Sequence, residues 1–260
     1  MIHVPDPVSV AYSAAGAEIE GVLFDIDDTL VDLEQAMGRT LQAIDDPALG
    51  HLSDDDWILY TSLYSSDPQQ HYNRFLAGEI TFTEQRVHRV RHARAGFTRE
   101  QFIGEAAESW MRAYDEILPV HFQAYDDVVP LLDALDERAI PYGAVSNNVH
   151  DYQRTKLDRA GLRRIRAVVG IDAVGVAKPE PAIYHEGARL IGTAPGRTLY
   201  VGDNRVIDGL GALAAGLSGV WLDRKGSDGE AHIDPGIDPG TVVPRITGLA
   251  DVLQFLPPVR

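Results

Sequence analysis

A short apolar run that ends in a group of acids is the feature that most restricts the fold of this chain. Residues 22–24 have the composition of a buried strand, and Asp25, Asp27 and Asp28 follow within four positions. Carboxylates this close repel one another and raise one another's pKa values. A divalent cation that prefers oxygen ligands would remove this cost. The segment therefore predicts a strand whose end carries a metal site and a candidate nucleophile.

Strand and helix patterns alternate over the second half of the chain. Helices are predicted at 128–139, 150–160, 181–191 and 207–215, and strands at 142–145, 166–170, 198–201 and 219–222. Residues 226–240, rich in Gly, Asp and Pro, are predicted as a loop, and 246 with 249–255 as the segment that closes the fold. Strands that alternate with helices of about ten residues indicate parallel βαβ units. We therefore expect an α/β fold with a Rossmann-like, three-layer parallel sheet as its core.

Residues 33–125 have a different pattern, in which apolar side chains recur every three or four positions. Trp57, Tyr60 and Tyr64 fall on one helical face, and Val90 and Ala93 fall on another. The basic residues of 86–94 are predicted to form a solvated helix face, with contact to a substrate as the alternative. We expect an all-α insert over 33–125, between the core segments 1–32 and 126–260.

The charge of the chain restricts its partners. The formal net charge is -16 and the isoelectric point is about 4.8, so nucleic acid and anionic membranes are repelled and neither is expected as a partner. Any phosphate site needs its own positive charge. The chain has no cysteine, which excludes disulfides, thiolate zinc sites and cysteine nucleophiles. No lysine or arginine precedes Arg39 and no apolar run approaches about 18 residues, which predicts a cytoplasmic location.

Polar residues follow the predicted strands at the point where each strand ends. They are Asp25, Asp27, Ser146, Asn147, Asp203 and, five positions further on, Asp208. Lys178 precedes a helix that begins with Pro181. In an open parallel sheet, ligands gather at the carboxyl ends of the strands. We therefore expect these side chains to form one site.

Four short segments also resemble the motifs of the haloacid dehalogenase (HAD) superfamily. Asp25-Ile-Asp-Asp-Thr29 is similar to the first motif, Asp-x-Asp-x-Thr, and Ser146 is similar to the second. Lys178, in Lys-Pro-Glu-Pro, resembles the third motif, and Gly-Asp-Asn at 202–204 with Asp208 resembles the fourth. All four occur in the expected order between residues 20 and 222. The resemblance implies that the insert at 33–125 is a helical cap domain.

The resemblance implies catalytic roles for two of the acids. Asp25 would attack phosphorus and form an aspartyl-phosphate. Asp27 would protonate the leaving oxygen and then activate a water molecule. The implied metal is Mg²⁺, with side-chain oxygens from Asp25 and Asp203 and the backbone carbonyl of Asp27 as ligands. Asp208 completes the predicted metal set, either as a ligand or by supporting the site through water or Lys178.

The remaining motif residues are implied to bind the phosphoryl group. The Ser146 hydroxyl and the Asn147 backbone would donate hydrogen bonds to its oxygens, and Thr29 is predicted to bind substrate. Lys178 would supply the positive charge that this acidic chain otherwise lacks.

The predicted function is a Mg²⁺-dependent phosphatase that acts on a small soluble phosphomonoester. Three alternatives remain at this stage. The resemblance implies that a dehalogenase on the same fold would lack the second acid and need no metal, so Asp27 argues against it. A phosphomutase or phosphotransferase would use an alcohol in place of water. A non-catalytic binding protein would have no need to keep Asp25, Asp27, Lys178 and Asp203 together. The identity of the phosphomonoester and the oligomeric state do not follow from these patterns.

Overall fold

The computed structural model of the chain describes residues 18–226 and 242–258. The chain divides into two compact units. One comprises residues 32–123, and the other comprises the described parts of 1–31 and 124–260. Residues 227–240 of the predicted loop lie outside the described residues.

A six-stranded parallel sheet forms the centre of the larger unit. Its strands are β1 (Gly21–Phe24), β2 (Tyr142–Val145), β3 (Ala167–Val169), β4 (Thr198–Gly202), β5 (Ser218–Leu222) and β6 (Arg245–Ile246). Their order is β3-β2-β1-β4-β5-β6, and every pairing is parallel. Phe24 at the end of β1 lies between Ala144 and Val201. From β1 the chain adds β2 and β3 on one side, and then β4, β5 and β6 on the other side. Such a reversal of strand order places a ligand site at the carboxyl ends of β1 and β4.

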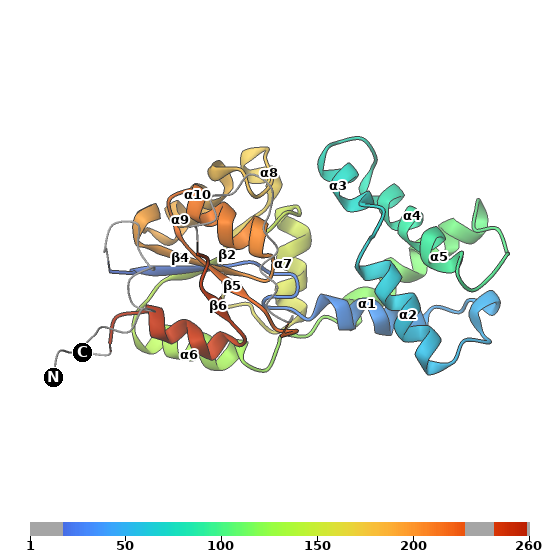
Figure 1. The fold of residues 1–260 in the computed structure, drawn as a ribbon, viewed down its shortest axis with the longest axis horizontal. Coiled ribbons are helices and arrows are strands. Elements are labelled where there is room, and N and C mark those ends of the chain that lie inside the picture. The colour runs from blue at the N-terminus through green and yellow to red at the C-terminus, as the bar shows by residue number, and fades with distance from the viewer. Residues whose placement is uncertain (1–17, 227–241, 259–260) are drawn as a thin grey trace. The chain divides into compact units, whose positions relative to one another are not determined.

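Helices cover both faces of this sheet. In Figure 1, α6 (Val128–Glu137) and η6 (Leu249–Phe255) lie below it, and α9 (Pro181–Ile191) and α10 (Gly211–Ala214) lie above it. This unit also contains α7 (His150–Arg159), α8 (Ile171–Val174) and the short η4 (Pro195–Arg197). Leu23, Val145 and Tyr200 of three neighbouring strands pack with Ile183 and Tyr184 of α9 in the buried core. The predicted three-layer, Rossmann-like α/β core is therefore confirmed.

The segment after β4 differs from its prediction. A helix was expected over 207–215, but the structure has a π-helix, η5 (Arg205–Leu210), followed by the single turn of α10. The Asn204 side chain accepts hydrogen bonds from the Val206 and Ile207 N–H groups and starts the segment two residues early. A side chain at Gly219 of β5 would collide with the Gly209 carbonyl. This close approach of η5 to the sheet depends on glycine, which an amphipathic pattern does not reveal.

All the regular secondary structure of the smaller unit, residues 32–123, is helical. Its helices are α1 (Leu33–Ala43), α2 (Asp54–Ser65), α3 (His71–Leu76), α4 (Phe82–Arg94) and α5 (Glu105–Ile117), with short 3-10 segments η2 (Pro47–Leu49) and η3 (Leu118–Val120). The two ends of the unit meet, because the Asp32 N–H donates to the Gln123 carbonyl (3.0 Å). Val31 and Ala124 form an isolated antiparallel bridge just outside it.

The prediction of a solvated basic face on α4 is wrong for three of its arginines, although Arg91 is exposed. Arg86, Arg89 and Arg94 are at most 9% exposed. The Arg86 guanidinium lies over two aromatic rings and pairs with Asp115 (2.6 Å). The Arg89 guanidinium lies over the Tyr64 ring. Aromatic faces and ion pairs compensate these charges on burial, and a pattern of hydropathy alone does not show such partners.

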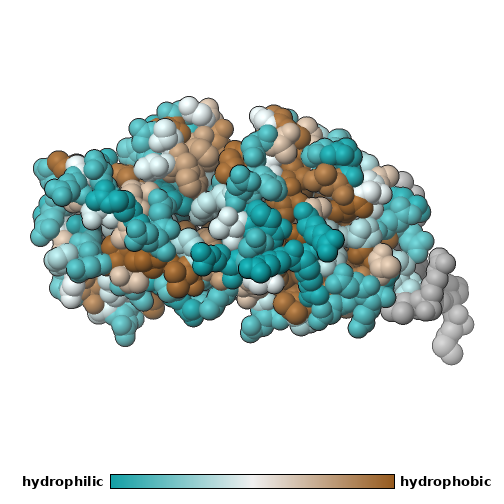
Figure 2. All heavy atoms as spheres, turned by 180° about the vertical axis from the view of Figure 1, so that it is seen from behind, coloured by the Kyte–Doolittle hydropathy of each residue, from teal (hydrophilic) through white to brown (hydrophobic). Residues whose placement is uncertain are grey.

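Apolar side chains also occur on the surface of the protein. Figure 2 shows them among polar ones on the face that it presents, as is usual for a globular protein. No helix within 18–226 and 242–258 has both the length and the apolar character that a membrane crossing needs.

Candidate active site

The chain turns sharply at the end of β1 and presents its acids there. The Asp25 N–H donates to the Val201 carbonyl of β4 (2.9 Å), which extends the pairing by one residue. Asp28 has a left-handed backbone (φ 57°), and its N–H donates to the Val31 carbonyl (2.8 Å). Aspartate tolerates this conformation better than most residues. The turn therefore holds Asp25, which is 6% exposed, and Asp27 at the carboxyl end of β1.

Lys178 joins two of the acids from the loop before α9. Its Nζ lies 2.5 Å from Asp25 Oδ1 and 2.7 Å from Asp208 Oδ1, and it donates to the Tyr200 hydroxyl (3.0 Å). Burial alone would lower the pKa of Lys178, but Asp208 and Asp25 hold it well above its usual range. The side chain is therefore cationic at neutral pH, as a phosphate site in this acidic chain would require.

The Asn147 side chain holds the backbone of Lys178 in place. The Lys178 N–H donates to Asn147 Oδ1 (2.6 Å), and Asn147 Nδ2 donates to the Lys178 carbonyl (3.0 Å). Phosphate binding by the Asn147 backbone remains a prediction. The positioning of Lys178 by the Asn147 side chain was not predicted, because it depends on two loops that are distant in sequence.

Three carboxylates at this edge could hold a metal ion. Oxygens of Asp25, Asp203 and Asp208 all lie within 4.8 Å of one another. Burial raises the pKa of Asp25 to about 7, with Asp208 and Asp27 adding to the effect of burial and Lys178 opposing it. Desolvation by the surrounding protein, followed by repulsion from Asp25 and Asp208, raises the pKa of Asp203 to about 9. The Asp203 side chain nevertheless stays exposed, so water at the rim weakens this shift.

The donor set fits Mg²⁺, which accepts carboxylate oxygens and usually takes only one or two of them from the protein. The raised pKa values show that ionising these carboxylates is unfavourable without a counter-charge, and a bound cation would supply that charge. Asp208 is the least suited of the three for direct ligation. Its Oδ1 pairs with Lys178 and its Oδ2 accepts from the Asn204 N–H (3.0 Å). Asp25 and Asp203 are therefore the better candidate ligands, and Asp208 supports the site through Lys178.

Thr29 differs from its prediction as a substrate-binding residue. It is 0% exposed, so a substrate could not reach it in this arrangement. Its Oγ1 accepts a hydrogen bond from the Asp203 N–H (3.0 Å), and Trp221 Nε1 donates to the Asp203 carbonyl (2.9 Å). Arg224 donates to the Thr29 carbonyl (2.8 Å). Thr29 thus holds the loop after β4 against the turn after β1.

Sequence reasoning missed two residues of α7. Ser146 directly follows β2 as predicted, and its Oγ accepts from Gln153 Nε2 (2.6 Å). Gln153 also donates to Asp27, and Lys156 forms an ion pair with the same carboxylate. The signal in the sequence was the spacing of Gln153 and Lys156, which places them on one face of the helix that begins shortly after Ser146, at His150.

Comparison with known families identifies the chain. A family model for hydrolases, described as haloacid dehalogenase-like hydrolase, matches residues 19–216. The chain is a haloacid dehalogenase-like hydrolase. The predicted resemblance to this superfamily is therefore confirmed.

Individual relatives of this hydrolase include both phosphatases and dehalogenases. It is 31% identical over 251 residues to the glyceraldehyde 3-phosphate phosphatase of Methanopyrus kandleri, an alignment that covers 92% of this chain and 98% of the relative. The HAD hydrolase YfnB from Bacillus subtilis, solved with magnesium, superposes with a TM-score of 0.70 at 21% identity, over 92% of this chain and 99% of that chain. The L-2-haloacid dehalogenase RSc1362 superposes with a TM-score of 0.65 at 25% identity, with the same coverage.

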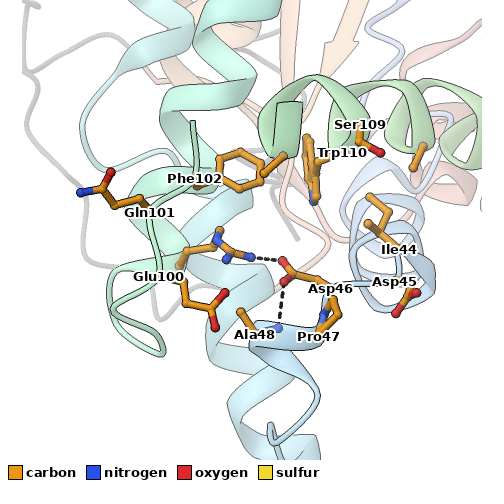
Figure 3. A pocket seen from close by; sticks show the side chains of 13 residues that line it. Ile44, Asp45, Asp46, Pro47, Ala48, Glu100, Gln101, Phe102, Ser109 and Trp110 are labelled. Carbon is orange, nitrogen blue, oxygen red and sulfur yellow. Dashed lines mark hydrogen bonds and ion pairs between the residues drawn. The ribbon is translucent and has the colours of Figure 1, made fainter. Parts of the chain in front are cut away.

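A separate pocket lies within the helical unit of this hydrolase. It has a volume of about 470 Å³, and all its lining residues lie between positions 44 and 113. Figure 3 shows the side chains that line it. Phe102 and Trp110 form part of its wall, and Arg94 is the only cationic group among the lining residues. Because Arg94 already forms an ion pair with Asp46, we assign no phosphate to this pocket.

Proposed function

We propose that this hydrolase is a Mg²⁺-dependent phosphatase that cleaves a small phosphomonoester through an aspartyl-phosphate. The observation that carries the proposal is the position of Asp25, held by Lys178 (2.5 Å) with Asp203 alongside, where the strand order of the sheet reverses. The phosphatase from Methanopyrus kandleri, similar over nearly its whole length, supports the same class of reaction.

The first step transfers the phosphoryl group to the protein. A carboxylate oxygen of Asp25 attacks phosphorus, and the bond from phosphorus to the leaving oxygen breaks with both electrons going to that oxygen. Asp27 donates its carboxyl proton to the same oxygen, so the product leaves as a neutral alcohol. Lys178 compensates the charge around the transferring group.

The second step releases inorganic phosphate. Asp27, now a carboxylate, takes a proton from a water molecule as the water oxygen bonds to phosphorus. The bond between phosphorus and the Asp25 oxygen breaks, and Asp25 returns to its initial state. Bound Mg²⁺ would supply positive charge that stabilises the phosphoryl oxygens during both steps. The Ser146 hydroxyl and the Asn147 N–H are the proposed hydrogen-bond donors to those oxygens.

We assign residues 32–123 the role of a cap that excludes water and sets specificity. The proposed substrate is a small phosphorylated metabolite in the cytoplasm, with no nucleic acid or membrane involved. A dehalogenase is the second candidate, because RSc1362 has a similar fold and is named as one. Asp27 disfavours it, since attack on carbon with departure of a halide ion requires no proton donor for the leaving group.

Hydrolysis of para-nitrophenyl phosphate tests the proposal directly. We expect release of inorganic phosphate that stops when a chelator removes divalent cations and returns when Mg²⁺ is added. The variant Asp25→Asn is expected to lower kcat by about 10³-fold or more. Turnover that persists in chelator, or an Asp25→Asn variant with normal activity, would exclude this mechanism. Halide release from a haloacid would favour the dehalogenase, and transfer of phosphate to an added alcohol would favour a phosphotransferase.

A further inference from the structure

Two buried side chains of α7 hold the carboxylate of Asp27. Lys156 Nζ pairs with Asp27 Oδ1, and Gln153 Nε2 donates to Asp27 Oδ2 (3.0 Å). Gln153 and Lys156 are 0% and 1% exposed, whereas the Asp27 side chain is 28% exposed. The two donors lie three positions apart and therefore share one face of the helix. They reach Asp27 from the protein interior and leave part of the carboxylate accessible.

These contacts restrict the orientation of all three side chains. A buried ammonium group is strongly disfavoured without a partner of opposite charge, and Asp27 is that partner for Lys156. The orientation of Gln153 follows from the same contact. A carboxylate only accepts hydrogen bonds, so the amide must present its Nε2 rather than its oxygen to Asp27. The carboxyl group of Asp27 is therefore held in one position instead of rotating freely.

Gln153 also orients the hydroxyl group of Ser146. Its Nε2 donates to Ser146 Oγ (2.6 Å) as well as to Asp27. Because Ser146 Oγ accepts this bond, its own hydrogen is directed elsewhere. That hydrogen can donate to a phosphoryl oxygen. One amide thus sets the direction of two groups that the proposed reaction uses.

We infer that Gln153 and Lys156 are positioning residues that hold Asp27 where it transfers its proton to the departing oxygen. The inference rests on the proposed phosphatase reaction. In its first step Asp27 carries a proton on a lone pair that Lys156 and Gln153 leave free, and this proton moves to the leaving oxygen as the bond from phosphorus to that oxygen breaks. A displaced carboxyl group delivers this proton inefficiently. Loss of either donor should therefore slow the cleavage of esters with weakly acidic leaving groups, which depend most on protonation.

The test compares substituted phenyl phosphates whose leaving groups range from strongly to weakly acidic. The measured quantity is kcat/KM, which reports the steps up to departure of the leaving group. In Lys156→Met and in Gln153→Leu we expect a loss of about 10²-fold for the least acidic leaving group, and of less than about tenfold for nitrophenol. Lys156→Arg, which keeps the charge, is expected to recover part of the first loss. The matched control is Thr155→Ala on the exposed face of α7, which is expected to behave as wild type.

The outcomes separate this inference from the proposed function. A similar loss for every ester would indicate a purely structural role and overturn the inference, as would wild-type rates in both variants. If Lys156→Met does not unfold cooperatively on heating, Gln153→Leu and Lys156→Arg provide the same comparison. A wild-type protein that hydrolyses no ester, or an active Asp25→Asn variant, would instead defeat the proposed function. The inference fails, and the proposed function stands, when the wild type is active and the variants show the same dependence of kcat/KM on leaving-group acidity as the wild type.

Discussion

Lys178 lies between two carboxylates in the least accessible part of the site. Its Nζ contacts both Asp25 and Asp208, and all three side chains are at most 9% exposed. Removing one partner of a buried ion pair leaves an uncompensated charge and typically costs about 3–5 kcal/mol. Lys178 is thus expected to contribute to stability as well as to phosphate binding.

The variant Lys178→Met tests this double role. We expect the free energy of unfolding to fall by about 3 kcal/mol, because Asp25 and Asp208 lose their common cation. We also expect hydrolysis of para-nitrophenyl phosphate to fall by at least about 10²-fold. Urea unfolding and initial rates measure the two effects. A variant with wild-type stability would show that the two carboxylates do not need this cation.

Asp25 should make stability depend on pH when no metal is bound. Burial raises its pKa from 3.8 to about 7, so between these values the folded protein keeps a proton that the unfolded chain has released. The free energy of unfolding should therefore decrease as pH rises through this window, by up to about 1.4 kcal/mol per pH unit. Lys178 does not change charge there, because its pKa is raised well above 10.5.

Urea unfolding in chelator, at several pH values between about 4 and 7, measures this decrease. Asp25→Asn removes the titrating group and should show a shallower decline than wild type. Adding Mg²⁺ to the wild type should flatten the curve in the same way, since the cation favours the ionised carboxylate. Parallel curves for wild type and Asp25→Asn would contradict the assignment.

At the scale of the element, α4 packs through buried arginines as well as through Val90 and Ala93, which are both 0% exposed. Arg89 Nε donates to the Tyr64 carbonyl of α2 (2.8 Å), and its guanidinium lies 4.4 Å from the centre of the Tyr64 ring. The helix therefore docks through a hydrogen bond and a cation–π contact that are both buried.

Arg89→Met keeps most of the apolar stem and removes the charge. We expect a loss of about 2 kcal/mol in the free energy of unfolding, because the buried Tyr64 carbonyl loses its donor. The matched control is Arg99→Met, whose parent side chain is exposed, and its effect should stay within about 0.5 kcal/mol. Urea unfolding compares the two. Equal stability of both variants would mean that Arg89 contributes no more than a surface arginine.

At the scale of the whole molecule, the chain leaves the sheet and returns to it at almost the same place. The Asp32 N–H contacts the Gln123 carbonyl, and Val31 bridges Ala124. Each of the two units has its own buried side chains. An insert whose ends meet can in principle be removed without separating the strands on either side of it.

Replacing residues 33–122 by a short glycine–serine linker tests this independence. We expect the shortened protein to unfold cooperatively, since the sheet and its covering helices remain. Its kcat/KM for a small phosphomonoester should fall by about 10²-fold, because nothing would exclude water or position the substrate. Circular dichroism during heating and initial rates are the measurements. A shortened protein without cooperative unfolding would show that the larger unit depends on the insert.

The strands and the acids at their ends could be predicted because the signals are local. The apolar run before Asp25 and the apolar run before Asp203 each predict a buried strand that ends next to a carboxylate. The alternation with helices then implies parallel strands, whose carboxyl ends share one edge. The structure places these two carboxylates within ligating distance of a common point. The helix at 207–215 was less predictable, because a close contact with Gly219 and the cap at Asn204 decide its form.

The amino-acid sequence by itself determined the class of fold, the helical insert and the acids and lysine that could do chemistry, since each depends on neighbouring residues in the chain. The tertiary structure decided what each polar side chain contacts. It turned Thr29 toward the Asp203 backbone, Asn147 toward the Lys178 backbone, and Gln153 and Lys156 toward Asp27. The physical reason is that a hydrogen bond forms only within about 3 Å, and the distance between two loops is set by the packing of the helices and strands that carry them.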